Sequence, residues 1–507
     1  MKRYAGVLLP VTSLPSKYGI GCFDQAAYDF VDWLQKAGQR YWQILPLGAT
    51  SYGSSDDSPY QAYSAFAGNP YLISLDALVE EGVLTREECD GVSFGDNPAK
   101  VDFDKLHEHR FALLHKAYER SGISANPDYQ NFIRDNGWWL NDYALFMALK
   151  TFFHDQPFRA WPEDIRMHWG FALEHYNREL YFDIEFQKYM QFKFNQQWSR
   201  LKAYANGKHI QIVGDIPIYV SPDGADVWAH PELFQLDAHN APTAIAGCPP
   251  DAFAEDGQVW GNPLYNWNFH RATDYAWWVS RMWYSFKLYD VVRIDHFRGF
   301  DTYWAIPADS ATAKTGKWEN GPGMELFEAL EAALGQLPII AEDLGELFPS
   351  VRKLLADSTF PGMKVLQFAF SGGDNEYLPH NHVKNSVVYP GTHDNTTITA
   401  WWESAATPKE KATAAAYLHL TGAHPTAKEV AAVKTAAART ALLRAALGSV
   451  ADRAIIPMYD WLGLGEEAHL NTPGKLGGNW AWRAAAGFES KTLAKTIADE
   501  CSVYCRV

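Results

Sequence analysis

The chain has 507 residues, of which 47% are hydrophobic and 15% aromatic, and its formal net charge is −16. This length suits one large α/β domain with insertions, or two or three ordinary domains. The acidic balance and the absence of a basic stretch argue against nucleic acid and against anionic membrane surfaces as partners. No stretch approaches the roughly 20 consecutive apolar residues that a membrane span needs.

Two apolar runs near the N-terminus, residues 5–11 and 40–47, have the length and composition of buried strands. Between them Phe30 and Leu34 recur at helical spacing, so the segment predicts a βαβ unit. The second run is followed by residues 51–73, a loop rich in Ser, Gly and Tyr. Loops that follow strands of a parallel sheet tend to bind ligands.

Three long segments interrupt the remaining strand pattern. Residues 80–206 have helical patterns only, which predicts a helical insertion between the second and third strands. Residues 223–289 are rich in Gly, Pro and aromatic residues and predict a loop-rich insertion between strands three and four. An alanine-rich stretch within 400–450 predicts a further helical insertion between strands seven and eight.

The strand candidates number eight, and helical patterns alternate with them. Their starts lie near residues 5, 40, 209, 291, 337, 362, 386 and 453. No low-complexity linker separates them, so the fold class that we predict is α/β, a single (β/α)₈ TIM barrel domain spanning 1–507 with large, mostly helical insertions. A doubly wound open sheet is the competing interpretation, and no GxGxxG follows the first strand to support it.

The segment VVRIDHFRGF, residues 291–300, combines a buried strand with a charged and aromatic end. Barrel enzymes place their active sites at the carboxyl ends of strands, where Asp295 and His296 would lie. Arg293 precedes Asp295 by two residues and therefore shares its strand face. The alternative is that Arg293 and Asp295 form an internal ion pair that only joins strand to loop.

Four acids fall at predicted strand ends: Asp215, Asp295, Glu342 and Asp394. Such a cluster is costly unless a cation or a proton compensates for the repulsion. Mg²⁺ or Ca²⁺ is one possible cation, but Arg293 beside the acids removes the need for a metal, and we expect no cofactor. The histidines beside two of these acids either bind sugar hydroxyls or are ordinary core residues; they are His296 and His393.

Glycoside chemistry needs two carboxyls on either side of the scissile bond, one as acid and one as nucleophile or base. A protonated glutamate with a raised pKa suits the acid, which favours Glu342. An ionised aspartate suits the nucleophile, and the Arg293 guanidinium would keep Asp295 deprotonated at neutral pH. A pair of this kind would suit glycoside chemistry.

The five cysteines are odd in number and share no CxxC or zinc-finger spacing. They predict neither a disulfide framework nor a metal cluster. The N-terminal apolar run is short for a signal peptide and continues into the first predicted strand. We therefore expect a cytoplasmic protein, of unknown oligomeric state.

Several long motifs resemble those of the amylomaltases, the 4-α-glucanotransferases also called disproportionating enzymes. They include GDIPIYV, VVRIDHFRGF, IIAEDLGE, GTHDNTT, GQVWGNPLYNW and NTPGKLGGNWAWR, in the order of that family and over nearly the whole chain. The resemblance implies a retaining double displacement on α-1,4-glucans, with maltodextrins as donor and acceptor. It implies Asp295 as nucleophile, Glu342 as general acid/base and Asp394 as the acid that stabilises the transition state.

The resemblance also implies a set of substrate-binding residues, which we number in this sequence as Arg293, His393, Asp215, Tyr60, Trp260, His296, Ser58 and Asn471. Tyr60 and Trp260 match aromatic residues that stack on or cover the glucan. One departure is Tyr459, where the family has glutamine. Two alternatives remain open from the residues alone: an α-glucan hydrolase, and a catalytically silent glucan-binding protein on the same scaffold.

Overall fold

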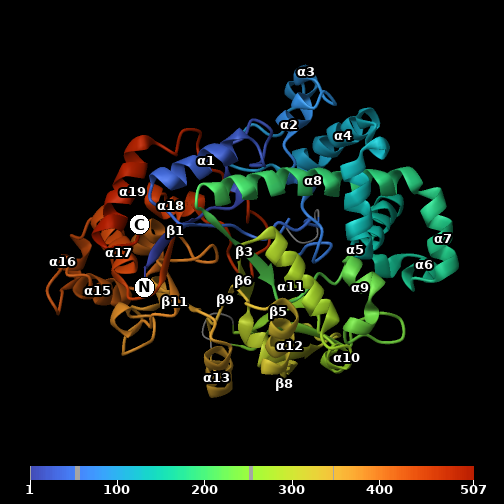
Figure 1. Cartoon of the computed structure of the whole chain (residues 1–507). Coiled ribbons are helices and arrows are strands. Elements are labelled where there is room, and N and C mark those ends of the chain that lie inside the picture. Colours follow the sequence, from blue (N-terminus) through green and yellow to red (C-terminus); the bar gives the residue numbers. More distant parts are fainter. Residues whose placement is uncertain (1, 52–56, 251–254, 346) are drawn as a thin grey trace.

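The computed structural model describes residues 2–51, 57–250, 255–345 and 347–507. Its centre is a barrel of eight parallel strands, as predicted (Figure 1). They are β1 (Tyr4–Leu8), β2 (Tyr41–Gln43), β3 (Gln211–Pro217), β6 (Val291–Asp295), β9 (Ile339–Ala341), β10 (Gly362–Val365), β11 (Ser386–Tyr389) and β12 (Arg453–Pro457). Each coincides with one of the eight apolar runs, because a short buried run bounded by polar residues is typical of a parallel strand.

The strands follow the order β10-β11-β12-β1-β2-β3-β6-β9, and every neighbouring pair is parallel. The alternative of a doubly wound open sheet is therefore wrong, since β12 and β1 join the two halves of the chain. Between β9 and β10 the Ala341 amide donates to the Pro361 carbonyl at 3.0 Å. This contact brings the two end strands together and nearly closes the barrel.

The segment between β2 and β3 is helical. It contains α2 (Leu75–Glu80), α3 (Arg86–Asp90), α4 (Phe103–Ser121), α5 (Pro127–Phe152), α6 (Glu163–Arg166), α7 (Gly170–Glu179) and α8 (Tyr181–Gly207). The long helices α5 and α8 pack against each other, and α8 extends from the barrel to the far end of the molecule (Figure 1). Asn126 caps α5 through the amides of Asp128 and Tyr129, ahead of a proline in the first turn.

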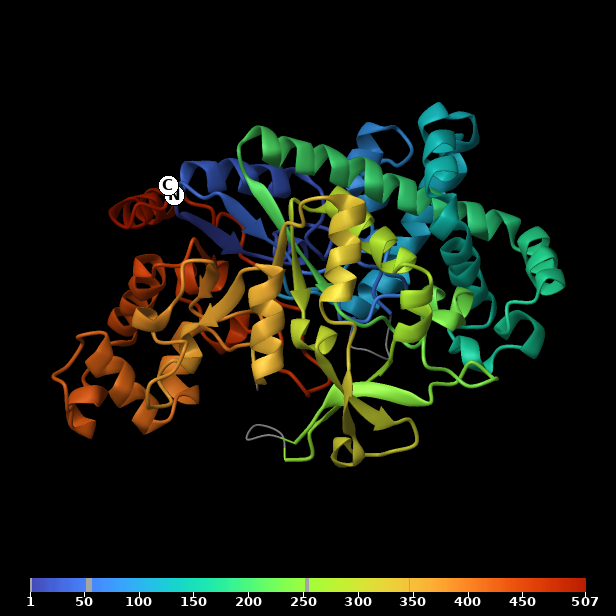
Figure 2. The same ribbon diagram turned by 60° about the horizontal axis from the view of Figure 1, so that its bottom comes forward.

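The connections around β6 contain a second sheet that the sequence analysis missed. Its strands are β4 (Ala244–Cys248), β5 (Gln258–Pro263), β7 (Thr302–Pro307) and β8 (Lys317–Asn320), in the antiparallel order β5-β4-β7-β8. In Figure 2 it lies below the barrel, at the bottom of the view. Because β7 follows β6 directly, this small sheet lies on the side of the carboxyl end of β6. The region 223–289 is thus less loop-rich than expected.

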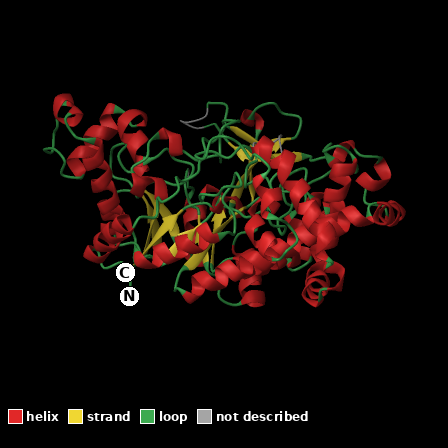
Figure 3. Cartoon of the chain, turned by 90° about the horizontal axis from the view of Figure 1, so that it is seen from above, coloured by secondary structure: helices red, strands yellow, loops and turns green. Residues whose placement is uncertain are grey.

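The remaining helices lie around the barrel or in segments that extend from it, and Figure 3 shows helices on both sides of the strands. They are α1 (Gln25–Lys36), α9 (Ala225–Ala229), α10 (Trp267–Ala272), α11 (Ala276–Leu288), α12 (Met324–Leu334), α13 (Pro349–Ser358), α14 (Ile398–Ala400), α15 (Pro408–Tyr417), α16 (Ala427–Ala431), α17 (Thr435–Gly448), α18 (Met458–Leu462) and α19 (Lys491–Val503). Helices α14 to α17 lie between β11 and β12. The division into one domain with three insertions stays a prediction. Within the described ranges, no helix has the length and apolar character needed to cross a bilayer.

Candidate active site

Four strands of the barrel bring the predicted acids to one end of the molecule. Asp215 lies in β3, Asp295 is the last residue of β6, Glu342 follows β9 directly, and Asp394 lies shortly after β11. In the register of β3 and β6, Asp215 is paired with Arg293. Gly214 is required beside Asp215, because a side chain there would overlap the ring of Tyr289. The acids therefore meet at the carboxyl ends of the strands, where barrel enzymes act.

A cleft of about 530 Å³ opens at this end of the barrel. Seven of the residues singled out from the sequence line it: Ser58, Tyr60, Trp260, Asp295, His296, Asp394 and Asn471. The other four are Asp215, Arg293, Glu342 and His393, and each contacts one of the seven from behind. The structure therefore brings all eleven residues together.

The Arg293 guanidinium is buried and is shared by two carboxylates. Its Nη1 donates to both oxygens of Asp215, at 2.8 and 2.6 Å, and its Nη2 lies 3.0 Å from Asp295 Oδ1. Burial raises the pKa of Asp295, and the positive charge of Arg293 acts in the opposite direction. The arginine therefore offsets part of the cost of burying the charged form of Asp295 and favours its ionised state.

Glu342 is held by two backbone amides. Leu344 N donates to Oε1 and His296 N donates to Oε2, both at 2.8 Å. His296 adopts a left-handed conformation, with φ of 55°, which is unusual for a residue other than glycine. Burial and the charge of Asp295 raise the pKa of Glu342 to about 8. This carboxyl therefore carries a proton at neutral pH, as a general acid requires.

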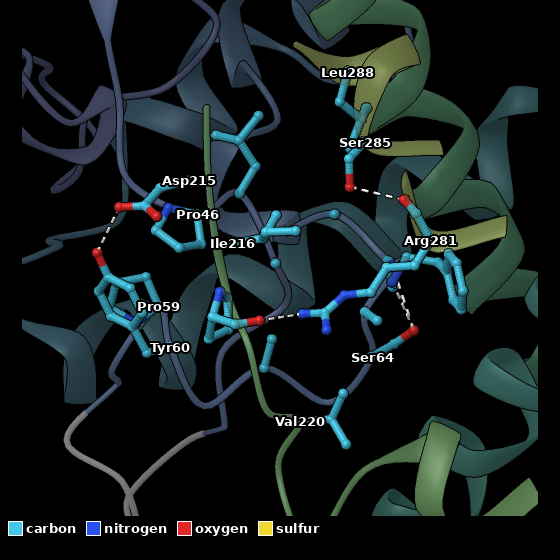
Figure 4. Close-up of a pocket in the computed structure, with 18 of the residues that line it drawn as sticks. Pro46, Pro59, Tyr60, Ser64, Asp215, Ile216, Val220, Arg281, Ser285 and Leu288 are labelled. Atoms are coloured by element: carbon cyan, nitrogen blue, oxygen red, sulfur yellow. Dashed lines mark hydrogen bonds between the residues drawn. The ribbon is translucent and has the colours of Figure 1, made fainter. Parts of the chain in front are cut away.

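Tyr60 connects the two sides of the site. Its hydroxyl donates to Asp215 Oδ2 at 2.9 Å (Figure 4). The same hydroxyl lies 2.7 Å from His393 Nε2. His393 Nε2 lies 3.2 Å from Asp394 Oδ2, and Asn471 Nδ2 donates to Asp394 Oδ1 at 2.6 Å. Burial lowers the pKa of His393, so its ring is neutral. Since the Tyr60 proton goes to Asp215, the proton of His393 is expected on Nε2, facing Tyr60.

A small internal cavity of about 50 Å³ lies behind Tyr60 and Asp215, and Figure 4 shows its lining. On its far side Arg281 of α11 donates to the carbonyls of Pro217 and Ile218, at 2.5 and 2.9 Å. These carbonyls belong to the end of β3 and to the residue that follows it. Arg281 thus satisfies the strand end that carries Asp215.

The two aromatic residues predicted to contact the glucan lie on opposite elements. Trp260 belongs to β5 of the small sheet, and its ring meets that of His296 edge-on with centroids 4.8 Å apart. Tyr60 lies in the loop after β2, where Ser58 Oγ accepts a hydrogen bond from the Tyr60 amide at 3.3 Å. Ser58 therefore shapes the turn that presents Tyr60 to the cleft.

Several residues of the cleft escaped the sequence analysis. Gln61, Tyr219, Gln258, Asn262, Lys475 and Trp480 also line it. Trp480 stood in a quoted motif, NTPGKLGGNWAWR, from which only Asn471 was selected. At the position of the departure, the Tyr459 hydroxyl donates to the carbonyl of Thr392 at 3.0 Å, so it supports the segment that carries His393. Within the described ranges, no group of three or more His, Cys, Asp or Glu is arranged to hold a metal ion.

Comparison with known families decides the identity of this site. A family model described as 4-alpha-glucanotransferase matches residues 9–488. The chain belongs to this family. The transferase is 44% identical over 498 residues to the 4-alpha-glucanotransferase of Clostridium butyricum, covering 98% of this chain and 99% of the relative. It is 46% identical over 509 residues to that of Streptococcus pneumoniae, covering 100% and 98% of the two chains.

A solved structure agrees with this family membership over the full length of the transferase. The amylomaltase from Streptococcus agalactiae in complex with acarbose superimposes with a TM-score of 0.93. The two chains are 40% identical, and the superposition covers 100% of each. The expectation of a 4-α-glucanotransferase is therefore confirmed, and α-glucans are its substrates.

Proposed function

We propose that this 4-α-glucanotransferase transfers α-1,4-glucan segments between maltodextrins by a retaining double displacement in which Asp295 is the nucleophile. Glu342 acts as general acid and then as general base. One observation carries this assignment: a carboxyl with a raised pKa lies beside a cleft-lining aspartate that is paired with an arginine. The proton on Glu342 suits the general acid, and the charge of Arg293 favours the ionised form of Asp295 that a nucleophile needs.

In the first step, the Asp295 carboxylate attacks the anomeric carbon while Glu342 donates its proton to the oxygen of the departing sugar. The glycosidic bond breaks, and an ester between Asp295 and the glucan forms. The reducing-end fragment leaves with the proton of Glu342. Glu342 is then a carboxylate, ready to act as a base.

In the second step, the 4-hydroxyl of an acceptor sugar attacks the same carbon. Glu342 accepts the hydroxyl proton, the ester bond to Asp295 breaks, and a new α-1,4 bond forms. Two inversions give net retention. The enzyme returns to its starting state with Glu342 protonated, which matches its raised pKa.

Asp394 is proposed to bind hydroxyls of the sugar that carries the developing positive charge. Asn471 donates to its Oδ1, and His393 Nε2 lies 3.2 Å from its Oδ2, so the carboxylate enters the reaction already oriented. Tyr60 and Trp260 are proposed to contact the flat apolar faces of the glucan. Asp215 is proposed to act through Arg293 and Tyr60, because it is fully buried.

Transfer prevails over hydrolysis only where an acceptor sugar is held in attack geometry and water is kept out. The cleft suits this requirement, since its walls come from the loop after β2, the small sheet and the segment from Asn471 to Trp480. We further propose a cytoplasmic location, because Cys22, Cys89, Cys501 and Cys505 are free thiols, as suits a reducing compartment.

Incubation of the purified enzyme with maltotriose tests this proposal. Glucose together with maltodextrins longer than maltotriose is the expected product pattern, because a glucan segment passes from one sugar to another. A sample with Glu342→Gln serves as control and should form neither product at a comparable rate. Maltose and glucose as the only products would instead support the hydrolase alternative.

A further inference from the structure

The gap between β9 and β10 is the weakest part of the barrel ladder, and Glu342 lies directly at its edge. The paired strands of the barrel run from β10 around to β9, and no ladder joins those two. Ala341 N donates to the Pro361 carbonyl, but the next amide of β10, that of Met363, has no carbonyl partner on β9. The position of Glu342 relative to β10 therefore depends on other contacts.

The side chain of Asp343 replaces the missing ladder bond. Its Oδ1 accepts the Met363 amide at 2.6 Å, and the side chain is buried, with an exposed fraction of 3% for the residue. Gly362 leaves room for it, since a Cβ at that position would lie 2.5 Å from Asp343 Oδ2. Because Asp343 directly follows Glu342 in the chain, this bond fixes the acid's segment to β10.

Strand β10 in turn contacts Arg293, the arginine that is paired with Asp295. The sulfur of Met363 lies 3.4 Å from Arg293 Nε, on the inner side of the barrel. The same guanidinium contacts Asp295 at 3.0 Å. A continuous set of contacts therefore leads from Asp343 through Met363 and Arg293 to Asp295, across the gap in the ladder.

The outer side of this gap is open rather than tightly packed. A cavity of about 410 Å³ lies there, lined by residues that include Asp343, Gly362 and Lys364. Lys364 Nζ lies 3.8 Å from Asp343 Oδ2 and 2.5 Å from Glu376 Oε2. Because a cavity lies on this side of the gap, we expect the hydrogen bond between Asp343 and the Met363 amide to contribute more to the alignment of β9 with β10.

We propose that Asp343 is a positioning residue that joins β9 to β10 and thereby holds Glu342 in place for proton transfer to the leaving sugar. This role rests on the proposed function, in which Glu342 is the general acid. Asp343 itself does not touch the substrate. Its contribution is the alignment of Glu342 with Arg293 and Asp295, for which displacements of about 1 Å cost on the order of 10²-fold in rate.

Two substitutions of Asp343 separate the effect of its hydrogen bond to the Met363 amide from the effect of its negative charge. Asp343→Asn retains an oxygen acceptor for the Met363 amide, so kcat for maltotriose should stay within roughly fivefold of the wild type. Asp343→Ala removes the acceptor and should lower kcat on the order of 10²-fold with little change in KM. Glu376→Gln is the matched control: it disturbs the ion pair with Lys364, leaves the Met363 bond intact, and should leave kcat unchanged.

A donor that needs no proton identifies the affected step. α-Maltosyl fluoride releases fluoride without help from an acid, so its first-turnover release should fall far less in Asp343→Ala than turnover of maltotriose. An equal loss with both donors would overturn the proposal, as would equal damage in Asp343→Asn and Asp343→Ala. Failure of the wild type to disproportionate maltotriose would instead refute the proposed function.

A second variant covers the case in which Asp343→Ala does not fold. Gly362→Ala keeps the aspartate but places a methyl group against its carboxyl, so it should weaken the same bond. It is expected to lower kcat for maltotriose at least tenfold while sparing fluoride release. A folded Gly362→Ala enzyme with wild-type kcat would refute the role of Asp343.

Discussion

At the scale of single residues, four carboxyl groups share the site with one positive charge, that of Arg293. Arg293 compensates Asp215 and Asp295, and both contacts are 3.0 Å or shorter. No second cation is in contact with Glu342 in the described structure; its oxygens accept backbone amides instead. Burial of Glu342 and, after it, the charge of Asp295 raise the pKa of Glu342, and the retained proton limits the repulsion between the carboxyls. The charge arrangement and the proposed division of roles therefore have the same origin.

The pH dependence of kcat/KM for maltotriose should show this division. Glu342 loses its proton as the pH rises through about 8, so activity should fall on the alkaline side because the acid is gone. On the acidic side, activity should fall as Asp295 gains a proton, at a pH above the ordinary aspartate pKa because burial raises it. Steady-state rates across the pH range measure the fall in kcat/KM on both the acidic and the alkaline side. Full activity well above pH 9 would contradict the role of Glu342.

At the scale of elements, a buried lysine ties the helical insertion to the wall of the cleft. Lys150 in α5 donates to the carbonyls of Asp155 and Gln156 and to Asp223 Oδ2, the last at 2.9 Å. Asp223 lines the cleft and also accepts the amide of Phe158 at 2.8 Å. The helical insertion is thus attached to the segment after β3. This attachment connects the stability of the insertion to substrate binding in the cleft.

Lys150→Met should loosen this attachment. The substitution leaves Asp223 and two carbonyls without their donor, and a loss of roughly 2–3 kcal/mol in unfolding free energy is expected because one partner remains partly exposed. KM for maltotriose should rise severalfold with kcat nearly unchanged, since the catalytic acids are not touched. Lys353→Met, which removes an exposed pair with Asp357, is the control and should change neither quantity. An unchanged KM in Lys150→Met would contradict this connection.

The fold and the site differed in how far the sequence could predict them. The eight barrel strands were predictable because each is a short apolar run, such as the buried VVRID of β6. The small sheet was not, because β8, with the sequence KWEN, has no buried residue and no apolar alternation. The four acids of the site were predicted because each lies at the end of a predicted strand. The role of Asp343 depends on a bond across the gap between β9 and β10, which no local pattern encodes.

At the scale of the whole molecule, the two chain ends lie together and complete the barrel beside β1 and β12 (Figure 1). Arg506 is fully buried and donates to four carbonyls, those of Tyr4, Leu447, Ser449 and Ala451. These carbonyls come from β1, from the end of α17 and from the segment between α17 and β12. One side chain therefore joins the first strand to the segment that leads into the last strand.

Arg506→Met should destabilise the whole fold. Four buried carbonyls would lose a charged donor, and a loss of about 3 kcal/mol or more is expected. The thermal unfolding midpoint should fall clearly, while kcat at 25 °C stays near the wild-type value because the site is at the other end of the strands. Arg444→Met, which removes an exposed pair with Glu500, should leave the midpoint unchanged. A wild-type midpoint in Arg506→Met would show that the chain ends do not stabilise the barrel.

The covalent intermediate is the most direct test of the central claim. A Glu342→Gln enzyme treated with α-maltosyl fluoride should accumulate the ester, because the fluoride leaves without an acid while the acceptor lacks its base. Mass spectrometry of the digested protein should then find the maltosyl group on the peptide that contains Asp295. A maltosyl group on Asp394 or Asp215, or rapid turnover without any covalent adduct, would contradict the account.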